Sequence, residues 1–132
     1  MKSNDKNTTL ETLRKEYGEF VKERNWSQYQ DPKSVAVSIT LEAAELLELF
    51  QWDTREQGAE KLQDPEWREK IKMELADIFI YTINFAMQAD IDLTEVFQEK
   101  LEKVRKKYPP ELVKTDLKAY RRIKEEHRKD RK

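Results

Sequence analysis

The chain has no cysteine among its 132 residues, and only two glycines and four prolines. The lack of cysteine excludes disulfides, thiol nucleophiles and cysteine-based zinc sites, and it is compatible with the cytoplasm, where we expect the protein to be located. So few glycines and prolines do not supply the many turns of an all-β fold. No apolar run approaches the roughly 20 residues of a membrane span, and the polar first ten residues do not resemble a signal peptide.

Charged residues make up 40% of the sequence and apolar residues 37%. This composition favours amphipathic helices with charged outer faces, and the length suits one domain with a hydrophobic core. The charge is uneven, because residues 1–99 contain 12 basic and 21 acidic residues, whereas residues 100–132 contain 14 and 6. An acidic body with a basic C-terminal third is not typical of a nucleic-acid-binding domain, so we expect no stable nucleic-acid partner and no membrane partner.

Capping residues followed by apolar residues at helical spacing predict four long helices. The predicted helices cover residues 8–25, 31–52, 64–89 and 92–107. The first begins at a capping box formed by Thr8 and Glu11, and residues 53–63 are predicted to form a loop with at most one turn. We therefore expect an all-α fold, a four-helix bundle over residues 1–110, with a basic C-terminal helical extension over residues 111–132.

The third predicted helix is apolar around most of its circumference between Ile71 and Met87. A helix of this kind is buried on several sides, which in so short a chain predicts that a partner subunit covers part of it. Gly18 lies in the middle of the first predicted helix, where glycine costs about 1 kcal/mol relative to alanine. Its presence suggests close packing at that point.

Two acidic doublets lie inside apolar helical sequence. Glu42 and Glu45 form the first, and Glu74 and Asp77 form the second. Their i, i+3 spacing places both carboxylates of a doublet on one helix face. On a helical wheel, each doublet falls within or beside the apolar arc, opposite to where solvent-facing acids belong.

Four carboxylates on one apolar interior repel one another unless cations neutralise them. The neutralising groups can be lysine or arginine side chains, but the sequence has none between Val35 and Phe50. The other candidate is a divalent metal. Carboxylate ligands without cysteine or histidine favour Mg²⁺ or Mn²⁺, and the sole histidine, His127, lies far away in the tail. Glu48, three residues after Glu45, is a further ligand, a base or a surface acid.

The two doublets and their surroundings resemble a known family. The pattern Glu42-Ala-Ala-Glu45, then 28 residues, then Glu74-Leu-Ala-Asp77, resembles the ExxE…ExxD signature of the MazG-like all-α nucleoside triphosphate pyrophosphohydrolases. The strings ELLELFQW and ELADIFIY, the RNW near the first turn and the KYP after the fourth helix are similar to the dCTP pyrophosphatase branch. Lys100, Tyr108 and Pro109 form the terminal Lys-x₇-Tyr-Pro element. The similarity covers about residues 10–110.

This resemblance implies an enzyme that uses Mg²⁺, with Mn²⁺ as an alternative, to cleave a (deoxy)nucleoside triphosphate into the monophosphate and pyrophosphate. The expected substrate is dCTP or a modified dCTP, and the expected role is cleaning of the nucleotide pool. The resemblance also implies a homotetramer, built as a dimer of dimers with sites between subunits.

Residue roles carry over by position. The implied metal ligands are Glu42, Glu45, Glu74 and Asp77. The implied nucleotide contacts are Trp26, Gln30, Trp52, Tyr81 and Lys100, of which Lys100 approaches the phosphates. Glu45 or Glu48 is the candidate base that accepts a proton from the attacking water. The branch often has histidine at position 30 and asparagine at position 104, where this chain has Gln30 and Val104, so base identity and phosphate binding stay open.

Two other hypotheses remain. One is a MazG-like module that binds a nucleotide or a metal with little turnover, which Gln30 and Val104 favour. The other is a helical oligomerisation domain, for which a divalent metal adds no stability.

Overall fold

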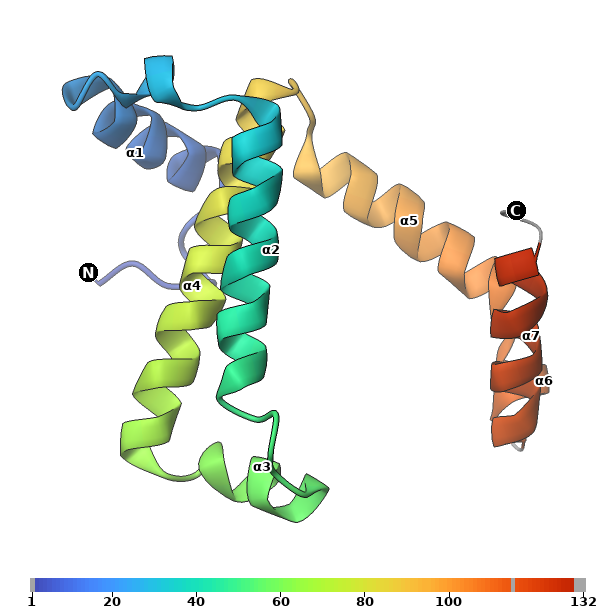
Figure 1. Cartoon of the computed structure of the whole chain (residues 1–132). Coiled ribbons are helices and arrows are strands. Elements are labelled where there is room, and N and C mark those ends of the chain that lie inside the picture. Colours follow the sequence, from blue (N-terminus) through green and yellow to red (C-terminus); the bar gives the residue numbers. More distant parts are fainter. Residues whose placement is uncertain (1, 115, 130–132) are drawn as a thin grey trace. The chain divides into compact units, whose positions relative to one another are not determined.

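The computed structural model describes residues 2–114 and 116–129, and the prediction of an all-α fold is confirmed, since no strand occurs in these ranges (Figure 1). The contacts divide the chain into two units at Ile91 and Asp92. The elements of the first unit are α1 (Leu10–Glu23), the 3₁₀ helix η1 (Trp26–Tyr29), α2 (Pro32–Glu48), α3 (Arg55–Lys61) and α4 (Pro65–Gln88). Those of the second are α5 (Leu93–Lys107), α6 (Pro110–Val113) and α7 (Leu117–Lys129). The predicted boundary at residue 110 stays a prediction.

Helices α2 and α4 form the long antiparallel pair of the first unit, and α1 packs against α4 near the C-terminal end of α4 (Figure 1). The most buried apolar side chains lie where these helices meet, at Val21 of α1, Val35 of α2, and Ile83 and Ala86 of α4. Gly18 allows this approach, because a Cβ atom there would lie 3.2 Å from the terminal methyl of Met87. The prediction of close packing at Gly18 is confirmed.

Aspartate caps begin three of the long helices as the sequence predicts. Asp31, Asp64 and Asp92 each accept a hydrogen bond from a backbone N–H in the first turn. The predicted cap at Thr8 is wrong by one residue, since Thr9 is the N-cap and accepts from the backbone N–H of Thr12.

The connection between α2 and α4 differs from the predicted loop. It contains α3, whose capping box pairs Thr54 with Gln57. The predicted end of the second helix at residue 52 is also wrong, because α2 ends at Glu48 and the chain turns. Lys61 stabilises this turn, since its Nζ donates to the Leu49 carbonyl at 2.5 Å and lies 2.6 Å from the Asp53 carboxylate. The same ammonium lies 4.1 Å from the centre of the Trp67 ring.

In the second unit, the short helix α6 packs against α7. Prolines at 109 and 110 end α5 and start α6, and Tyr108 packs against Tyr120 of α7 with ring centroids 5.1 Å apart. Ala119 is its buried apolar residue. In the described ranges, neither unit has a helix whose length and hydropathy would suit a membrane span.

Candidate metal centre and adjoining cavity

The pairing of α2 with α4 brings the two acidic doublets together. One carboxylate oxygen from each of Glu42, Glu45 and Glu74 lies within 4.8 Å of the other two. Glu42 and Glu74 are half-buried between the helices, whereas Glu45 is exposed. The i, i+3 spacing on each helix therefore allows these carboxylates to lie together in one cluster, which we call the acidic cluster.

The acidic cluster carries uncompensated negative charge. Burial, together with the carboxylates of Glu45, Asp77 and Glu74, raises the pKa of Glu42 above its ordinary value. Within the described part of the chain, no lysine or arginine forms an ion pair with any of these four acids. The interpretation that basic side chains neutralise the doublets thus has no support in the described residues.

Asp77 connects the acidic cluster to a cavity. It lies close enough to Glu42 to affect its ionisation, and it also lines a cavity of about 530 Å³ between α1, η1 and α4. Trp26, Gln30 and Tyr81 line the same cavity, which we call the aromatic cavity. Phe20 supports Trp26 in an edge-to-face contact with ring centroids 5.5 Å apart. This volume is within the range of small-ligand sites, and aromatic walls suit a planar ring.

The other predicted site residues, Trp52, Glu48 and Lys100, are exposed. Trp52 follows the end of α2 and is 88% exposed, and it is not among the residues that line the cavity. Glu48 is exposed at the last position of α2. Lys100 is an exposed residue of α5, in the second unit.

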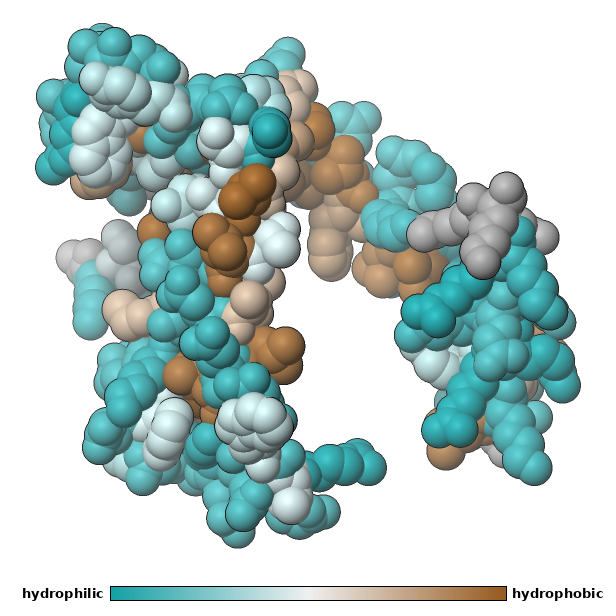
Figure 2. All heavy atoms as spheres, in the orientation of Figure 1, coloured by the Kyte–Doolittle hydropathy of each residue, from teal (hydrophilic) through white to brown (hydrophobic). Residues whose placement is uncertain are grey.

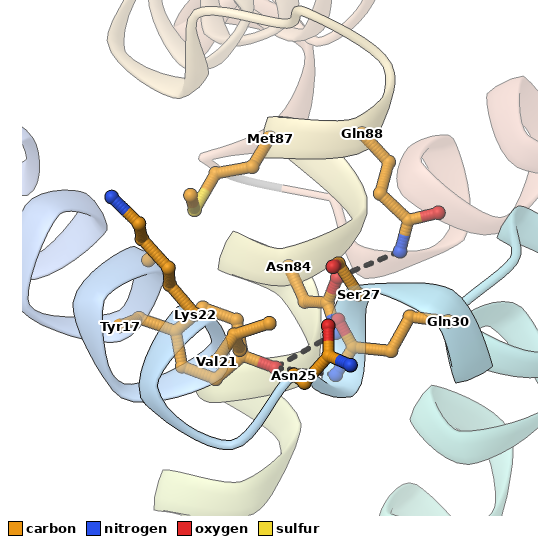
Figure 3. A pocket seen from close by; sticks show the side chains of 10 residues that line it. Tyr17, Val21, Lys22, Asn25, Ser27, Gln30, Asn84, Met87 and Gln88 are labelled. Carbon is orange, nitrogen blue, oxygen red and sulfur yellow. Dashed lines mark hydrogen bonds between the residues drawn. The ribbon is translucent and has the colours of Figure 1, made fainter.

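Two residues that the sequence did not identify also belong to this region. Tyr17 lines the aromatic cavity and a second, smaller cavity of about 330 Å³, which Asn84 also lines (Figure 3). Asn84 is 2% exposed and donates a hydrogen bond to the Tyr17 hydroxyl at 2.8 Å. The available signal was an asparagine inside the apolar run of α4, since a buried amide needs a polar partner.

The sequence profile of the MazG-like family matches residues 37–127, a span that contains both acidic doublets. The chain belongs to the MazG-like family. The fold of this MazG-like chain is similar to the crystal structure of a pyrophosphatase from Archaeoglobus fulgidus. The two are 36% identical, with a TM-score of 0.72, and the match covers 82% of this chain and 99% of the other.

The MazG-like chain is also similar to mammalian proteins named dCTP pyrophosphatase 1. It is 35% identical to the one from Bos taurus, over 79% of this chain and 62% of the relative. It is 32% identical to the one from Homo sapiens, over 85% of this chain and 66% of the relative. The chain therefore spans somewhat less than two thirds of the length of these curated relatives.

The acidic cluster has the chemistry of a cation site. All of its donor atoms are carboxylate oxygens, and they come from helices whose packing holds them together. Hard divalent cations prefer such ligands, and a cation would offset the burial and the carboxylate repulsion that together raise the pKa of Glu42. The cluster can thus hold a metal ion beside a cavity of suitable size for a nucleobase.

Proposed function

We propose that the chain is a Mg²⁺-dependent nucleoside triphosphate pyrophosphohydrolase. Its proposed substrate is dCTP or a modified dCTP, which it converts to the monophosphate and pyrophosphate in the cleaning of the nucleotide pool. The observation that carries the proposal is the position of Asp77, which lies close enough to Glu42 to affect its ionisation and also lines the aromatic cavity. A nucleotide whose base occupied this cavity would thereby have its phosphates beside the carboxylates. The names of the relatives support the choice of dCTP.

Each part of the site has a proposed role. Glu42, Glu45, Glu74 and Asp77 bind Mg²⁺, with Mn²⁺ as an alternative, and the bound metal supplies neutralisation of the triphosphate and a lower pKa for a water molecule. Glu45 is exposed and can accept the proton of the attacking water, a role that Glu48 shares as a candidate. Trp26 and Tyr81 hold the base, whereas the exposed Trp52 adds a further stacking surface.

Lys100 is the proposed phosphate contact from α5, where it is an exposed residue. An ammonium group beside the leaving pyrophosphate would stabilise the charge that develops there. The basic residues at the end of α5, Arg105, Lys106 and Lys107, serve at the same time as favourable charges at a helix C-terminus.

Release of pyrophosphate from a panel of nucleoside triphosphates tests the proposed function. In the presence of Mg²⁺, we expect turnover of dCTP with the monophosphate as the second product, and loss of turnover when the metal is chelated. Binding of dCTP by calorimetry without any product after long incubation would instead support a nucleotide-binding module.

We also propose that the protein assembles with copies of itself, as a tetramer built from two dimers. Large apolar side chains are exposed on both long helices of the first unit, and Figure 2 shows such hydrophobic surface over α2. On α2, Val37, Leu41 and Leu47 are 49%, 56% and 62% exposed; on α4, Met73 and Leu75 are 55% and 57% exposed. Val37 and Leu41 lie one turn apart on the same face of α2, and soluble monomers rarely leave large apolar patches in water.

Replacing Leu41 with aspartate should weaken the self-association by about a hundredfold or more, because an unpaired carboxylate would be buried in the interface. Light scattering coupled to size-exclusion chromatography measures the change in mass. Lys33→Asp, in the exposed first turn of the same helix, is the matched control and should leave the mass unchanged. An L41D protein that keeps the wild-type mass at all concentrations would contradict this assignment of the interface.

A further inference from the structure

Four polar side chains that line the smaller cavity form one hydrogen-bonded chain, and two of them, Tyr17 and Gln30, also line the aromatic cavity (Figure 3). Gln88 Nε2 donates to Asn84 Oδ1 at 2.7 Å, and Asn84 Nδ2 donates to the Tyr17 hydroxyl at 2.8 Å. Gln30 Nε2 donates to the same hydroxyl at 3.2 Å. These contacts join α1, α4 and the C-cap residue of η1, and the amide residue Asn84 among them is 2% exposed. A buried network of this kind restricts how each amide can turn.

The direction of these bonds determines what Gln30 presents to a ligand. The Gln30 amide nitrogen donates to Tyr17, so the Gln30 carbonyl oxygen is the group that can contact a ligand. This oxygen accepts no hydrogen bond from any described residue. The Tyr17 oxygen already accepts from two amides, which leaves its own hydrogen available to donate. Gln30 and Tyr17 both line the aromatic cavity that also contains Trp26 and Tyr81. An acceptor and a donor therefore lie side by side in its wall.

We propose that Gln30 and Tyr17 select a base that carries an exocyclic amino group next to an unprotonated ring nitrogen. The amino group donates to Gln30 Oε1, and the ring nitrogen accepts from the Tyr17 hydroxyl. Cytosine and adenine have this pattern on their pairing edge, whereas uracil, thymine and guanine have the reverse, a carbonyl next to a ring N–H. Asn84 is a positioning residue, since it holds Tyr17 and through it the orientation of the Gln30 amide.

This inference rests on the proposed function and adds to it the residues that distinguish one base from another. A site whose polar groups match the substrate rejects an analogue with the reverse pattern, because the site's own groups are then left unpaired. The matched pair of substrates is dCTP and dUTP, which have the same size and differ at the pairing edge. We expect wild-type kcat/KM to favour dCTP by about tenfold or more, mainly through KM.

Tyr17→Phe tests the inference, with Tyr29→Phe as the matched control because Tyr29 is 73% exposed and lines neither cavity. Y17F should lower the dCTP/dUTP ratio of kcat/KM by about tenfold, since Gln30 is then free to present its amino end. Y29F should keep the ratio. The double variant Y17F/Q30E should recover most of the ratio, because a carboxylate presents an acceptor whichever way it turns.

The outcomes separate this inference from the proposed function. If the wild type hydrolyses no nucleoside triphosphate, the proposed function is wrong. If it hydrolyses dCTP and dUTP equally well, or if Y17F is folded and keeps the wild-type ratio, base selection by Gln30 and Tyr17 is wrong while the proposed function stands. If Y17F fails to fold, Gln30→Leu provides the test. Q30L removes the acceptor and should lower the dCTP/dUTP ratio of kcat/KM. An unchanged ratio would overturn the inference.

Discussion

Replacement of Glu45 with glutamine should lower the rate of pyrophosphate release from dCTP by about a hundredfold or more. Glutamine keeps the size of the side chain but removes the negative charge that the proposed metal needs. Glu45 is the exposed member of the acidic cluster, so the substitution should leave the fold intact. Steady-state assays at saturating Mg²⁺ measure the loss, and circular dichroism checks the fold.

Two further variants complete this experiment. Glu19→Gln changes an exposed acid on α1 that lies outside the acidic cluster, and it should keep the wild-type rate. Glu48→Gln separates the two candidate bases, because a large loss would identify Glu48 as a participant, whereas a normal rate would assign it to the surface. Full activity of E45Q would contradict the role of the acidic cluster in the reaction.

Mg²⁺ should raise the melting temperature of the wild-type protein by about 5–10 °C at a concentration near 100 times the dissociation constant. The reason is that the acidic cluster exists only when α2 and α4 pack together, so the metal binds the folded state alone. Glu42→Gln should abolish this rise. In the metal-free protein it should instead increase the melting temperature, because it removes a charge that burial and three neighbouring carboxylates disfavour.

The pH dependence of the metal-free protein should follow from the raised pKa of Glu42. The folded state holds the Glu42 proton more tightly than the unfolded state does. Its stabilising contribution is therefore complete at pH values below the ordinary glutamate pKa and is lost as the pH rises through the raised pKa of the folded state. Thermal melts in chelator at acidic and neutral pH measure this loss of stability.

For the preceding prediction, an E42Q protein whose melting temperature still rises with Mg²⁺ would argue against the proposed metal site.

The acidic cluster illustrates how much of a site local spacing can predict. The sequence alone predicted that Glu42, Glu45 and Glu74 lie close together, because two acidic doublets, each with helical spacing, fall inside apolar sequence. The caps at Asp31 and Asp64 then set where each helix starts and so keep the doublets in helix interiors. Only the pairing of α2 with α4 had to be assumed, because the connection between them is long enough to contain the helix α3.

The features that the sequence did not predict depend mainly on contacts between residues that are distant along the chain. Tyr17 and Asn84 are 67 positions apart, so no periodicity in either segment indicates their hydrogen bond. The end of α2 was placed four residues too late because apolar sequence continues past Glu48, while the actual stop depends on a tertiary contact from Lys61. Helix α3 had a local signal, the Thr54-x-x-Gln57 capping box, but its seven residues are too few for periodicity to reveal.

The contacts of Lys61 bear on how the protein can be re-engineered. Leu49, whose carbonyl Lys61 holds, follows Glu45 by a single helical turn. The segment between α2 and α4 is therefore not a passive spacer that tolerates insertions or loop grafts. A graft that removed Lys61 would let the last turn of α2 unwind toward Glu45, so redesign of the connection should keep the Lys61, Asp53 and Trp67 contacts while changing the residues around them.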